Sequence, residues 1–305
     1  MTNYKSGFVT LLGRPNVGKS TLINKLIGEK ITITSPIAQT TRNKLKGILT
    51  TKKSQIIFVD TPGIHKPHHL LGEKLVKSAK SSIEGVDLIL LIFDSYKPPG
   101  RGDEYIRDFL LMNKSKFIVV LNKWDLVKQD EKKLRLNQYK EIFQDKLLTF
   151  SKISALTGDG SDQLISLIES YLPNGPMLYP QDIISDHPLS TIFSELIREQ
   201  VLLNTREEIP HSVAVKIEKI QEVKKQNNLN NLTAILATIV VEKKSQKGIL
   251  IGKKGAMLKV IGQSARINMK KLIDGPIYLE LFVKVIPNWR KKESKLIELG
   301  YDEFI

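Results

Sequence analysis

The sequence predicts an α/β protein in which a domain with a mixed, mostly parallel six-stranded sheet precedes a smaller α+β domain. Two observations predict this arrangement. Up to about residue 172, short apolar runs alternate with segments of helical period, which is typical of βα units around a mostly parallel sheet. Beyond a proline-rich segment, the periodicity changes to an α-β-β-α-β order.

The strands of the first domain are predicted from apolar runs of strand length at residues 7–12, 45–50, 54–60, 87–93, 116–121 and 148–153. Helices are expected to follow Gly18, Leu70, Asp103, Asp130 and Asp162. The runs 45–50 and 54–60 are joined by the short turn Thr51–Lys53, so we expect them to form an antiparallel hairpin at one edge. This hairpin makes the sheet mixed rather than wholly parallel.

The second domain follows a segment in which Pro173, Pro176, Pro180 and Pro188 lie close together, a composition typical of a linker. Periodicity then predicts a helix, two strands, a second helix and a third strand, at residues 192–201, 213–217, 235–241, 258–272 and 277–285. One more short helix is expected from Asn288 to Gly300. We therefore expect a first domain at 1–172, a linker at 173–188, a second domain at 189–287 and a C-terminal segment at 288–305.

Composition limits the class of protein. The 305 residues are 41% hydrophobic, enough for more than one core, and they include no cysteine, which excludes a disulfide framework and thiolate metal sites. The first strand begins too early for a signal peptide, and the apolar runs are too short to span a membrane, so we expect a soluble intracellular protein. A net charge of +15 predicts an anionic partner, either nucleic acid or an acidic membrane surface. A merely solvated basic surface is the alternative.

The first motif directly follows the first predicted strand and fits the phosphate-binding pattern G-x-x-x-x-G-K-[ST]. Glycines let the backbone N–H groups point at phosphate oxygens, and the following helix adds its positive N-terminal end. The lysine adds a full charge, and the last hydroxyl can hold Mg²⁺. The motif predicts a nucleoside triphosphate site made of Gly13, Arg14, Pro15, Asn16, Val17, Gly18, Lys19 and Ser20.

A second motif selects the base. Asn122, Lys123, Trp124 and Asp125 follow a strand, where the Asp125 carboxylate can accept from both the ring N1–H and the exocyclic amine of guanine. Adenine offers no such pair of donors on that edge, so the motif predicts GTP rather than ATP. Asn122 and Lys123 would brace the loop and cover the base. After the next strand, the Ser154–Ala155 turn can place a backbone N–H against the guanine oxygen.

A third group, Asp60-Thr61-Pro62-Gly63, follows the apolar run that ends at Val59, so Asp60 is expected to face the phosphates. There it would hold Mg²⁺ through water, and the Gly63 N–H would contact the γ-phosphate. A threonine of the loop 35–43 can complete the metal shell, and we favour Thr41 over Thr40. The predicted catalytic residues are therefore Lys19, Thr41, Asp60 and Gly63, and the loops 35–43 and 60–72 are the expected switch elements.

The residue after Gly63 indicates how fast GTP is hydrolysed. Many GTPases place a glutamine there to orient water, whereas this chain has Ile64, so we expect intrinsic hydrolysis on the order of 10⁻⁴ to 10⁻² per second. Asn16 can coordinate a K⁺ ion that supplies positive charge between the phosphates; the alternative is a hydrogen bond within its loop. The histidines His65, His68 and His69 could suggest a metal site, but a solvated loop is the expected interpretation.

The second domain carries G-K-K-G at Gly252–Gly255, before a predicted helix. Basic residues recur from Lys243 to Lys271 with no acidic residue between them. Within the α-β-β-α-β order this is the layout of a KH domain, whose GxxG turn lets a nucleic-acid backbone approach beside a groove for about four nucleotides. The predicted RNA-binding residues are Gly252, Lys253, Lys254, Gly255 and Lys259.

These motifs, with H-S-V-A-V at 211–215 and S-Q-K-G-I-L-I-G-K-K-G-A-M-L-K at 245–259, resemble the Era family of bacterial GTPases over essentially the whole chain. The resemblance implies a P-loop GTPase domain and a type II KH domain that binds the 3′ end of 16S rRNA during 30S subunit assembly. It also implies a cytoplasmic protein with a peripheral fraction at the inner membrane, and GTP contacts from residues 13–20, 60–64 and 122–125. The family carries an apolar residue at the position of Ile64.

Two other functions remain open at this point. The chain could be mainly an RNA-binding assembly factor with little turnover, or it could be a GTPase acting at the membrane or in tRNA modification. The basic region around the GxxG turn argues against the last of these. We expect a monomer that uses Mg²⁺ and, through Asn16, K⁺.

Overall fold

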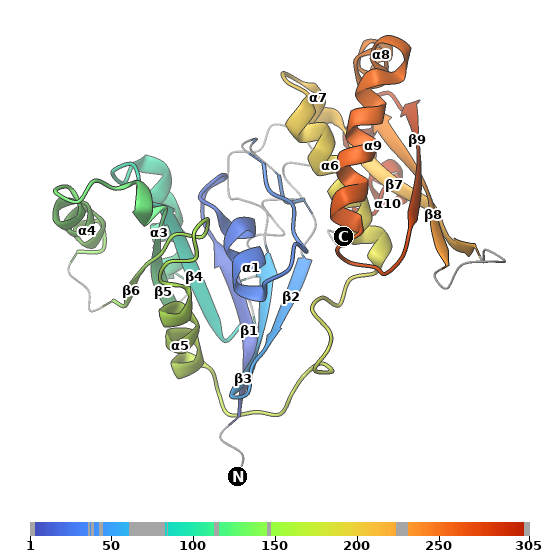
Figure 1. The fold of residues 1–305 in the computed structure, drawn as a ribbon. Helices are drawn as coiled ribbons and strands as arrows, with labels where there is room; N and C mark the ends of the chain where they lie inside the picture. The colour runs from blue at the N-terminus through green and yellow to red at the C-terminus, as the bar shows by residue number, and fades with distance from the viewer. Residues whose placement is uncertain are drawn as a thin grey trace. The chain divides into compact units, whose positions relative to one another are not determined.

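The structure, a computed structural model, describes residues 4–35, 37, 40–42, 45–60, 83, 85–112, 116–144, 148–223 and 231–301. By their contacts these residues form two compact units, whose helices and strands are labelled in Figure 1. Unit 1 holds the described residues of 4–32, 41–60 and 83–186, and unit 2 holds those of 33–40 and 187–301. Each unit is described separately.

Unit 1 contains the predicted six-stranded sheet. Its strands are β1 (Lys5–Leu12), β2 (Leu45–Thr50), β3 (Ser54–Asp60), β4 (Leu88–Asp94), β5 (Phe117–Asn122) and β6 (Phe150–Lys152). They lie in the order β2-β3-β1-β4-β5-β6, and every neighbouring pair is parallel except β2 and β3. Leu45 of β2 lies opposite Asp60 of β3, so the predicted edge hairpin is confirmed.

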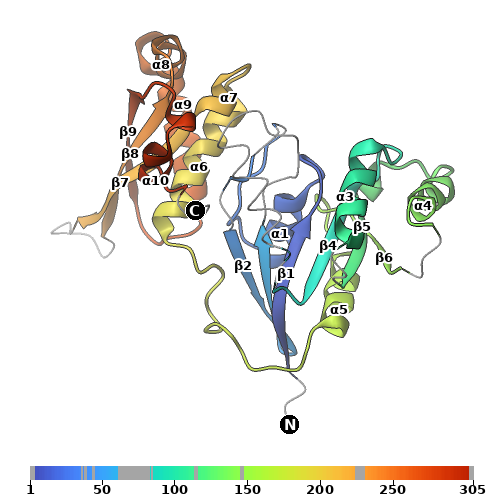
Figure 2. The same cartoon turned by 180° about the vertical axis from the view of Figure 1, so that it is seen from behind.

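Helices cover both faces of this sheet (Figure 2). The side chains of β4 alternate between the two faces. On one face, Leu88, Leu90 and Ile92 share a core with α1 (Lys19–Ile27) and α5 (Ser161–Tyr171). On the other face, Ile89, Leu91 and Phe93 share a second core with α3 (Arg101–Met112) and α4 (Lys132–Glu141). A strand buried on both faces reads as a continuous apolar run, because its side chains alternate between two cores.

The start of α3 differs from the prediction. The helix begins at Arg101, not after Asp103, because the Asp103 carboxylate accepts a hydrogen bond from the Gly100 N–H at 3.0 Å. Asp103 therefore caps the helix from inside its first turn. Asp162 likewise lies inside the first turn of α5, which begins at Ser161. The helix expected after Leu70 lies outside the described residues.

The proline-rich segment lies along unit 1 as far as Asp186. The Gly175 N–H donates to the Tyr4 carbonyl at 3.0 Å, and the Ile48 N–H donates to the Ile184 carbonyl at 2.8 Å. Lys46 and Asp186 form an ion pair of 2.8 Å. Residues 173–186 are therefore held by backbone hydrogen bonds at the edge of the first unit.

Unit 2 contains a three-stranded sheet in the order β7-β8-β9, with β7 antiparallel and β9 parallel to β8. Its core joins α6 and α9 to one face of this sheet through residues such as Phe193, Ala237 and Ala265. The elements are α6 (Leu189–Asn204), α7 (Ile209–Ser212), β7 (Ala214–Val223), β8 (Leu232–Val241), α8 (Lys244–Ile251), the 3₁₀ turn η2 (Lys253–Gly255), α9 (Ala256–Met269), β9 (Ile277–Val285), the 3₁₀ turn η3 (Trp289–Lys291) and α10 (Glu293–Glu298).

Two predictions for unit 2 need correction. Besides the expected elements, the chain forms the short helices α7 and α8, of which α8 ends directly before the G-K-K-G turn. The segment from Asn288 to Gly300 is not one helix, because Lys292 has an extended backbone between η3 and α10. The buried Trp289 donates its indole N–H to the Ser212 carbonyl at 2.9 Å, which anchors the first turn separately.

Within the part of the chain that the structure describes, no helix combines the length and the apolar character that a membrane span requires.

Candidate functional site

The predicted nucleotide motifs of unit 1 meet at one edge of the sheet. The loop at Gly13 follows β1, Asp60 ends β3, Asn122 ends β5, and Ser154 follows β6. These strands are parallel, so their carboxyl ends lie at the same edge. In open α/β sheets this edge is where ligands bind.

The shape of the loop Gly13–Ser20 depends on its two glycines. A Cβ atom at Gly13 would lie 2.5 Å from the Ile92 carbonyl oxygen. Gly18 has a φ of 99°, and a Cβ there would lie 2.3 Å from the Asn122 side-chain nitrogen. Asn16 also adopts a left-handed backbone, with a φ of 65°. The loop therefore curls tightly before α1 begins, as a phosphate cradle requires.

Lys19 is the buried cation of this loop, in contrast to the more exposed Arg14. Only 7% of the residue is exposed, and its Nζ donates to the carbonyl oxygens of Gly13 at 3.2 Å and Arg14 at 3.1 Å. Burial lowers the pKa of Lys19 to about 8, and the nearby Asp60 carboxylate partly opposes this shift. The ammonium group thus donates to two loop carbonyls, and a phosphate that enters the loop would stabilise its charged form.

Three oxygen-bearing side chains meet beside Lys19. Ser20 Oγ lies 2.9 Å from Thr41 Oγ1 and donates to Asp60 Oδ2 at 2.8 Å. Thr41 Oγ1 donates to the same Asp60 oxygen at 3.1 Å. One carboxylate and two hydroxyls are donors that suit a hard cation such as Mg²⁺. No group of three or more His, Cys, Asp or Glu that could hold a metal ion is found among the described residues, which leave out His65, His68 and His69.

Thr40, the alternative to Thr41, lies elsewhere. Its hydroxyl is 2.8 Å from Ser35 Oγ and donates to the Ile37 carbonyl at 2.6 Å. Its carbonyl accepts a hydrogen bond from Arg198 of α6, and both residues belong to unit 2. The two chain neighbours therefore have different surroundings, and only Thr41 lies with Ser20 and Asp60.

The Asn122 side chain links the base-selecting loop to the phosphate loop through hydrogen bonds. Its side-chain nitrogen donates to the Val17 carbonyl at 2.7 Å, and its side-chain oxygen accepts from the Ala155 N–H at 2.9 Å. Lys123 forms an ion pair of 2.6 Å with Asp94. Asp125 lies exposed in the 3₁₀ turn η1 (Trp124–Leu126). The loop is braced at Asn122 and Lys123, whereas the Asp125 carboxylate is accessible.

A cavity of about 270 Å³ lies beside these loops. Four of the eight predicted phosphate-loop positions and Lys123 of the base loop are among the residues that line it, which are Arg14, Pro15, Asn16, Val17, Asp94, Lys97, Pro98, Gly100, Asp103 and Lys123. Sequence reasoning missed Asp103, which forms an ion pair of 3.3 Å with Arg14 and so holds that side chain at the cavity. Thr61, Pro62, Gly63 and Ile64 lie outside the described residues.

The G-K-K-G turn of unit 2 joins α8 to α9. Gly252 and Gly255 have φ values of 70° and 80°, and a Cβ at Gly252 would lie 2.9 Å from the Met257 backbone nitrogen. Lys253 and Lys254 between them are exposed. The turn thus presents two cations on a backbone whose shape depends on glycine.

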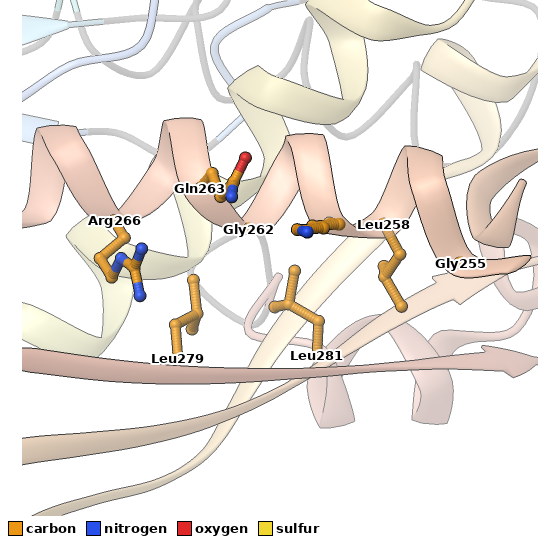
Figure 3. Close-up of a pocket in the computed structure, with 8 residues that line it drawn as sticks. Gly255, Leu258, Gly262, Gln263, Arg266, Leu279 and Leu281 are labelled. Atoms are coloured by element: carbon orange, nitrogen blue, oxygen red, sulfur yellow. The ribbon is translucent and has the colours of Figure 1, made fainter.

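Beside the turn lies a groove of about 360 Å³ between α9 and β9 (Figure 3). Leu258 and Arg266 point from α9 toward β9, and Leu279 and Leu281 point back from the strand. Gly255 and Lys259, both predicted, line it together with Leu258, Gly262, Gln263, Arg266, Leu279 and Leu281. The helical spacing of 258, 262 and 266 could have indicated one wall, but no local signal links α9 to β9.

The arrangement agrees with two family models, "50S ribosome-binding GTPase" over residues 8–123 and "KH domain" over residues 208–290. The chain is 54% identical to GTPase Era of Crocosphaera subtropica over 98% of this chain and 93% of that protein. It is 52% identical to GTPase Era of Nostoc sp. over 98% of this chain and 90% of that protein.

Solved structures give the same result. The crystal structure of Era in complex with MgGDPNP and nucleotides 1506–1542 of 16S ribosomal RNA is 41% identical, with a TM-score of 0.91 over 98% of this chain and 99% of that chain. An Aquifex aeolicus Era variant bound to GDP and AlF₄⁻ is 39% identical, with a TM-score of 0.90 over 97% of this chain and 99% of that chain. With both units and nearly the whole length matched, the chain belongs to the Era family of GTPases.

Proposed function

We propose that this chain is a GTP-hydrolysing switch that binds the 3′ region of 16S rRNA and acts in assembly of the 30S ribosomal subunit. The observation that carries the proposal is the meeting of Ser20, Thr41 and Asp60 beside the buried Lys19, in a chain whose second unit presents a G-K-K-G turn at a groove. The Era structure solved with MgGDPNP and 16S rRNA supports both ligands.

In the nucleotide site, the N–H groups of the loop Gly13–Ser20 and the Lys19 ammonium bind the phosphates. Asp125 accepts from the N1–H and amine of guanine, Asn122 and Lys123 brace the loop and cover the base, and the Ser154–Ala155 turn faces its oxygen. Mg²⁺, held by Ser20, Thr41 and Asp60, would neutralise charge on the phosphates. Gly63 would contact the γ-phosphate, and the apolar Ile64 beside it leaves water unoriented, so intrinsic hydrolysis is slow.

Thr41 rather than Thr40 is expected to matter for magnesium. Thr41→Ala removes a hydroxyl from the Ser20–Asp60 cluster and should weaken Mg²⁺-dependent GTP binding by roughly tenfold to a hundredfold. Thr40→Ala, the matched control, removes a hydroxyl bonded to Ile37 and Ser35 instead. Titration of a fluorescent GTP analogue with Mg²⁺ or EDTA measures both. Equal losses in the two variants would contradict the assignment.

Potassium is expected to accelerate hydrolysis through Asn16. Because a K⁺ ion would add positive charge beside the phosphates, GTP turnover should be roughly tenfold or more faster in KCl than in NaCl. Asn16→Gly should remove the difference, since glycine tolerates the φ of 65° while lacking the side-chain oxygen. Identical rates of the unaltered protein in the two salts would exclude the ion and leave Asn16 a role within its loop.

In unit 2, the groove between α9 and β9 is proposed to hold about four unstacked nucleotides. Its floor is apolar at Leu258, Leu279 and Leu281, which suits base faces. Lys253, Lys254 and Lys259 would contact the phosphates that pass the Gly252 and Gly255 backbone. The region from Lys243 to Lys271 has no acidic residue that would repel them.

Replacing Lys253 and Lys254 together with alanine is the direct test of RNA binding. We expect weaker binding to an RNA of nucleotides 1506–1542 of 16S rRNA. The slope of the logarithm of the binding constant against the logarithm of the salt concentration should become shallower by about 1.4, because two phosphate contacts are lost. Lys291→Ala with Lys292→Ala removes the same charge from an exposed pair elsewhere in unit 2 and should change little. An unchanged affinity of the Lys253 and Lys254 variant would contradict the proposed interface.

The same assay separates the alternatives. A switch requires the RNA affinity to differ between the GDP and GDPNP forms, so equal affinities would contradict it. Multiple-turnover hydrolysis of GTP that this RNA stimulates would exclude the alternative of an RNA-binding assembly factor with little GTP turnover. Crosslinking in cells that recovered tRNA instead of 16S rRNA would favour the tRNA-modification alternative.

We further propose a cytoplasmic monomer with a peripheral fraction on the cytoplasmic side of the inner membrane. The net charge of +15 supports attraction to anionic lipid headgroups. A membrane-bound fraction held in this way should be released by high salt, and its complete absence from washed membranes at low salt would contradict the peripheral contact.

A further inference from the structure

Asn24 lies in α1, one helical turn after Ser20, and its side chain bonds to the chain that follows this helix. Its Oδ1 accepts hydrogen bonds from the backbone N–H groups of Ile31 at 3.1 Å and Thr32 at 2.9 Å. Its Nδ2 donates to the Thr32 carbonyl oxygen at 2.7 Å. A carboxamide offers an acceptor and a donor side by side, so Asn24 binds both polar groups of the Thr32 backbone, as a neighbouring strand would.

The Thr32 side chain adds a second link to the same helix. Its hydroxyl oxygen lies 3.1 Å from the Ser20 carbonyl oxygen and 3.1 Å from Asn24 Oδ1, and the residue is wholly buried. A buried peptide group that loses its partners destabilises the conformation that buries it. The bonds of Asn24 to Ile31 and Thr32, and of Thr32 to Ser20, therefore fix this point of the chain at α1. We call them the Asn24 anchor.

Ser20 connects the Asn24 anchor to the proposed magnesium site. Its carbonyl oxygen lies at the Thr32 hydroxyl, whereas its Oγ lies 2.9 Å from Thr41 Oγ1 and donates to Asp60. The chain thus passes Ser20 twice, once at Thr32 and once at Thr41. The Asn24 anchor consists of protein groups alone, and only the second contact belongs to the metal donors. The position of Thr41 therefore depends on a point that the anchor fixes.

We propose that Asn24 is a positioning residue for Mg²⁺-dependent nucleotide binding, which fixes Thr32 beside Ser20 and so brings the Thr41 hydroxyl to the metal. This proposal rests on the magnesium site proposed above. Asn24 acts through Thr32 and Thr41 and does not bind the phosphates. A metal donor that is already held in place loses less conformational freedom when the metal binds, so the anchor strengthens the part of the affinity that depends on Mg²⁺.

The main test compares Asn24→Leu with Asn137→Leu in the full-length protein. Leucine has nearly the shape of asparagine but can neither donate nor accept, and Asn137 is an exposed asparagine of α4 in the same unit. A fluorescent GTP analogue is titrated in Mg²⁺ and in EDTA. In Asn24→Leu the affinity in Mg²⁺ should fall about tenfold, and that in EDTA less than about twofold, because the phosphate loop is unaltered. Asn137→Leu should match the unaltered protein in both.

Thr32 supplies a second pair of variants, which decides the matter if Asn24→Leu does not fold. Thr32→Val keeps the branched shape and removes the hydroxyl at Ser20, so its affinity in Mg²⁺ should fall about threefold. Thr32→Ser keeps the hydroxyl and should bind as the unaltered protein does. Equal affinities of the valine and serine variants would contradict the role of this bond.

Amide hydrogen exchange of the nucleotide-free protein reports the anchor without metal or nucleotide. The N–H groups of Ile31 and Thr32 should exchange about tenfold faster in Asn24→Leu, while those of β4 keep their rates, because only local bonds are lost. Faster exchange in β4 as well, with equal losses of affinity in Mg²⁺ and EDTA, would show that Asn24 serves the fold only and would overturn the proposal.

The two proposals fail in different ways. If the unaltered protein binds the analogue equally in Mg²⁺ and EDTA, the magnesium site itself fails. If its binding depends on Mg²⁺ and both Asn24→Leu and Thr32→Val keep that dependence, the magnesium site stands and the positioning role of Asn24 is overturned. A reduced dependence on Mg²⁺ in these two variants, with Thr32→Ser unchanged, supports it.

Discussion

Lys19→Ala is expected to weaken GTP binding at least a hundredfold while unit 2 stays folded. The Lys19 ammonium lies 3.2 Å and 3.1 Å from two loop carbonyls, buried at the point where the phosphates would enter. Charge-assisted contacts to phosphate in such a place are each strong, and no other lysine lies in the loop Gly13–Ser20. Calorimetric titration with GTP measures the loss.

Lys25→Ala is the matched control, because Lys25 lies exposed in the last turn of the same helix. It should bind GTP as the unaltered protein does. The RNA affinity of Lys19→Ala without nucleotide reports whether unit 2 is intact. Retained GTP binding by Lys19→Ala would contradict the phosphate-binding assignment of the loop.

The pKa of Lys19 adds a pH dependence with a definite sign. Its pKa in the folded protein is about 8, below the ordinary value of 10.5, because burial disfavours the charged form. Between these values the unfolded chain binds more protons, so the stability of the nucleotide-free protein should rise with pH from about 8 to 10.5. Lys19→Ala should lack this rise. The negative charge of bound phosphates would raise the pKa of Lys19 again, so binding of GTP above pH 8 should be accompanied by proton uptake. The affinity for GTP should therefore fall as the pH rises above about 8.

Asp125→Asn is expected to lower GTP affinity by a hundredfold or more and to shift preference toward xanthosine triphosphate. The asparagine oxygen can still accept from the ring N1–H, but its amide group faces the guanine amine donor to donor. Xanthine carries an oxygen in place of that amine, and this oxygen can accept a hydrogen bond from the asparagine amide. A site built around such a pairing discriminates strongly, because the wrong partner leaves polar groups unpaired.

The free energy of unfolding should not change in this variant, since Asp125 is exposed in η1. Asp130→Asn removes another exposed carboxylate a few residues further on and should leave both affinities unchanged. Competition between the two triphosphates measures the preference. An Asp125→Asn protein that still prefers GTP would show that another group reads the base.

Much of unit 1 could be predicted because its signals are local. Strands such as β4 are continuous apolar runs, and the short turn at Thr51–Lys53 allows only a hairpin. Two of the predictions that failed involve a single side-chain contact. Asp103 accepts from the Gly100 N–H and moves the start of α3, and Trp289 donates to Ser212 and separates η3 from α10. Such contacts depend on geometry that composition does not encode.

The sequence by itself determined the class of each site, because a phosphate loop, a guanine-selecting motif and a GxxG turn each place their functional groups within a few adjacent residues. The sequence also favoured Thr41 over Thr40 for the magnesium site, but only the tertiary structure decided the distances between residues far apart in the chain. Ser20 lies with Thr41 and Asp60 rather than Thr40, and Leu281 lies across from Gly262, since strand order and helix packing set distances between segments far apart in the chain. Periodicity reports which face of an element is buried, but not which element it faces.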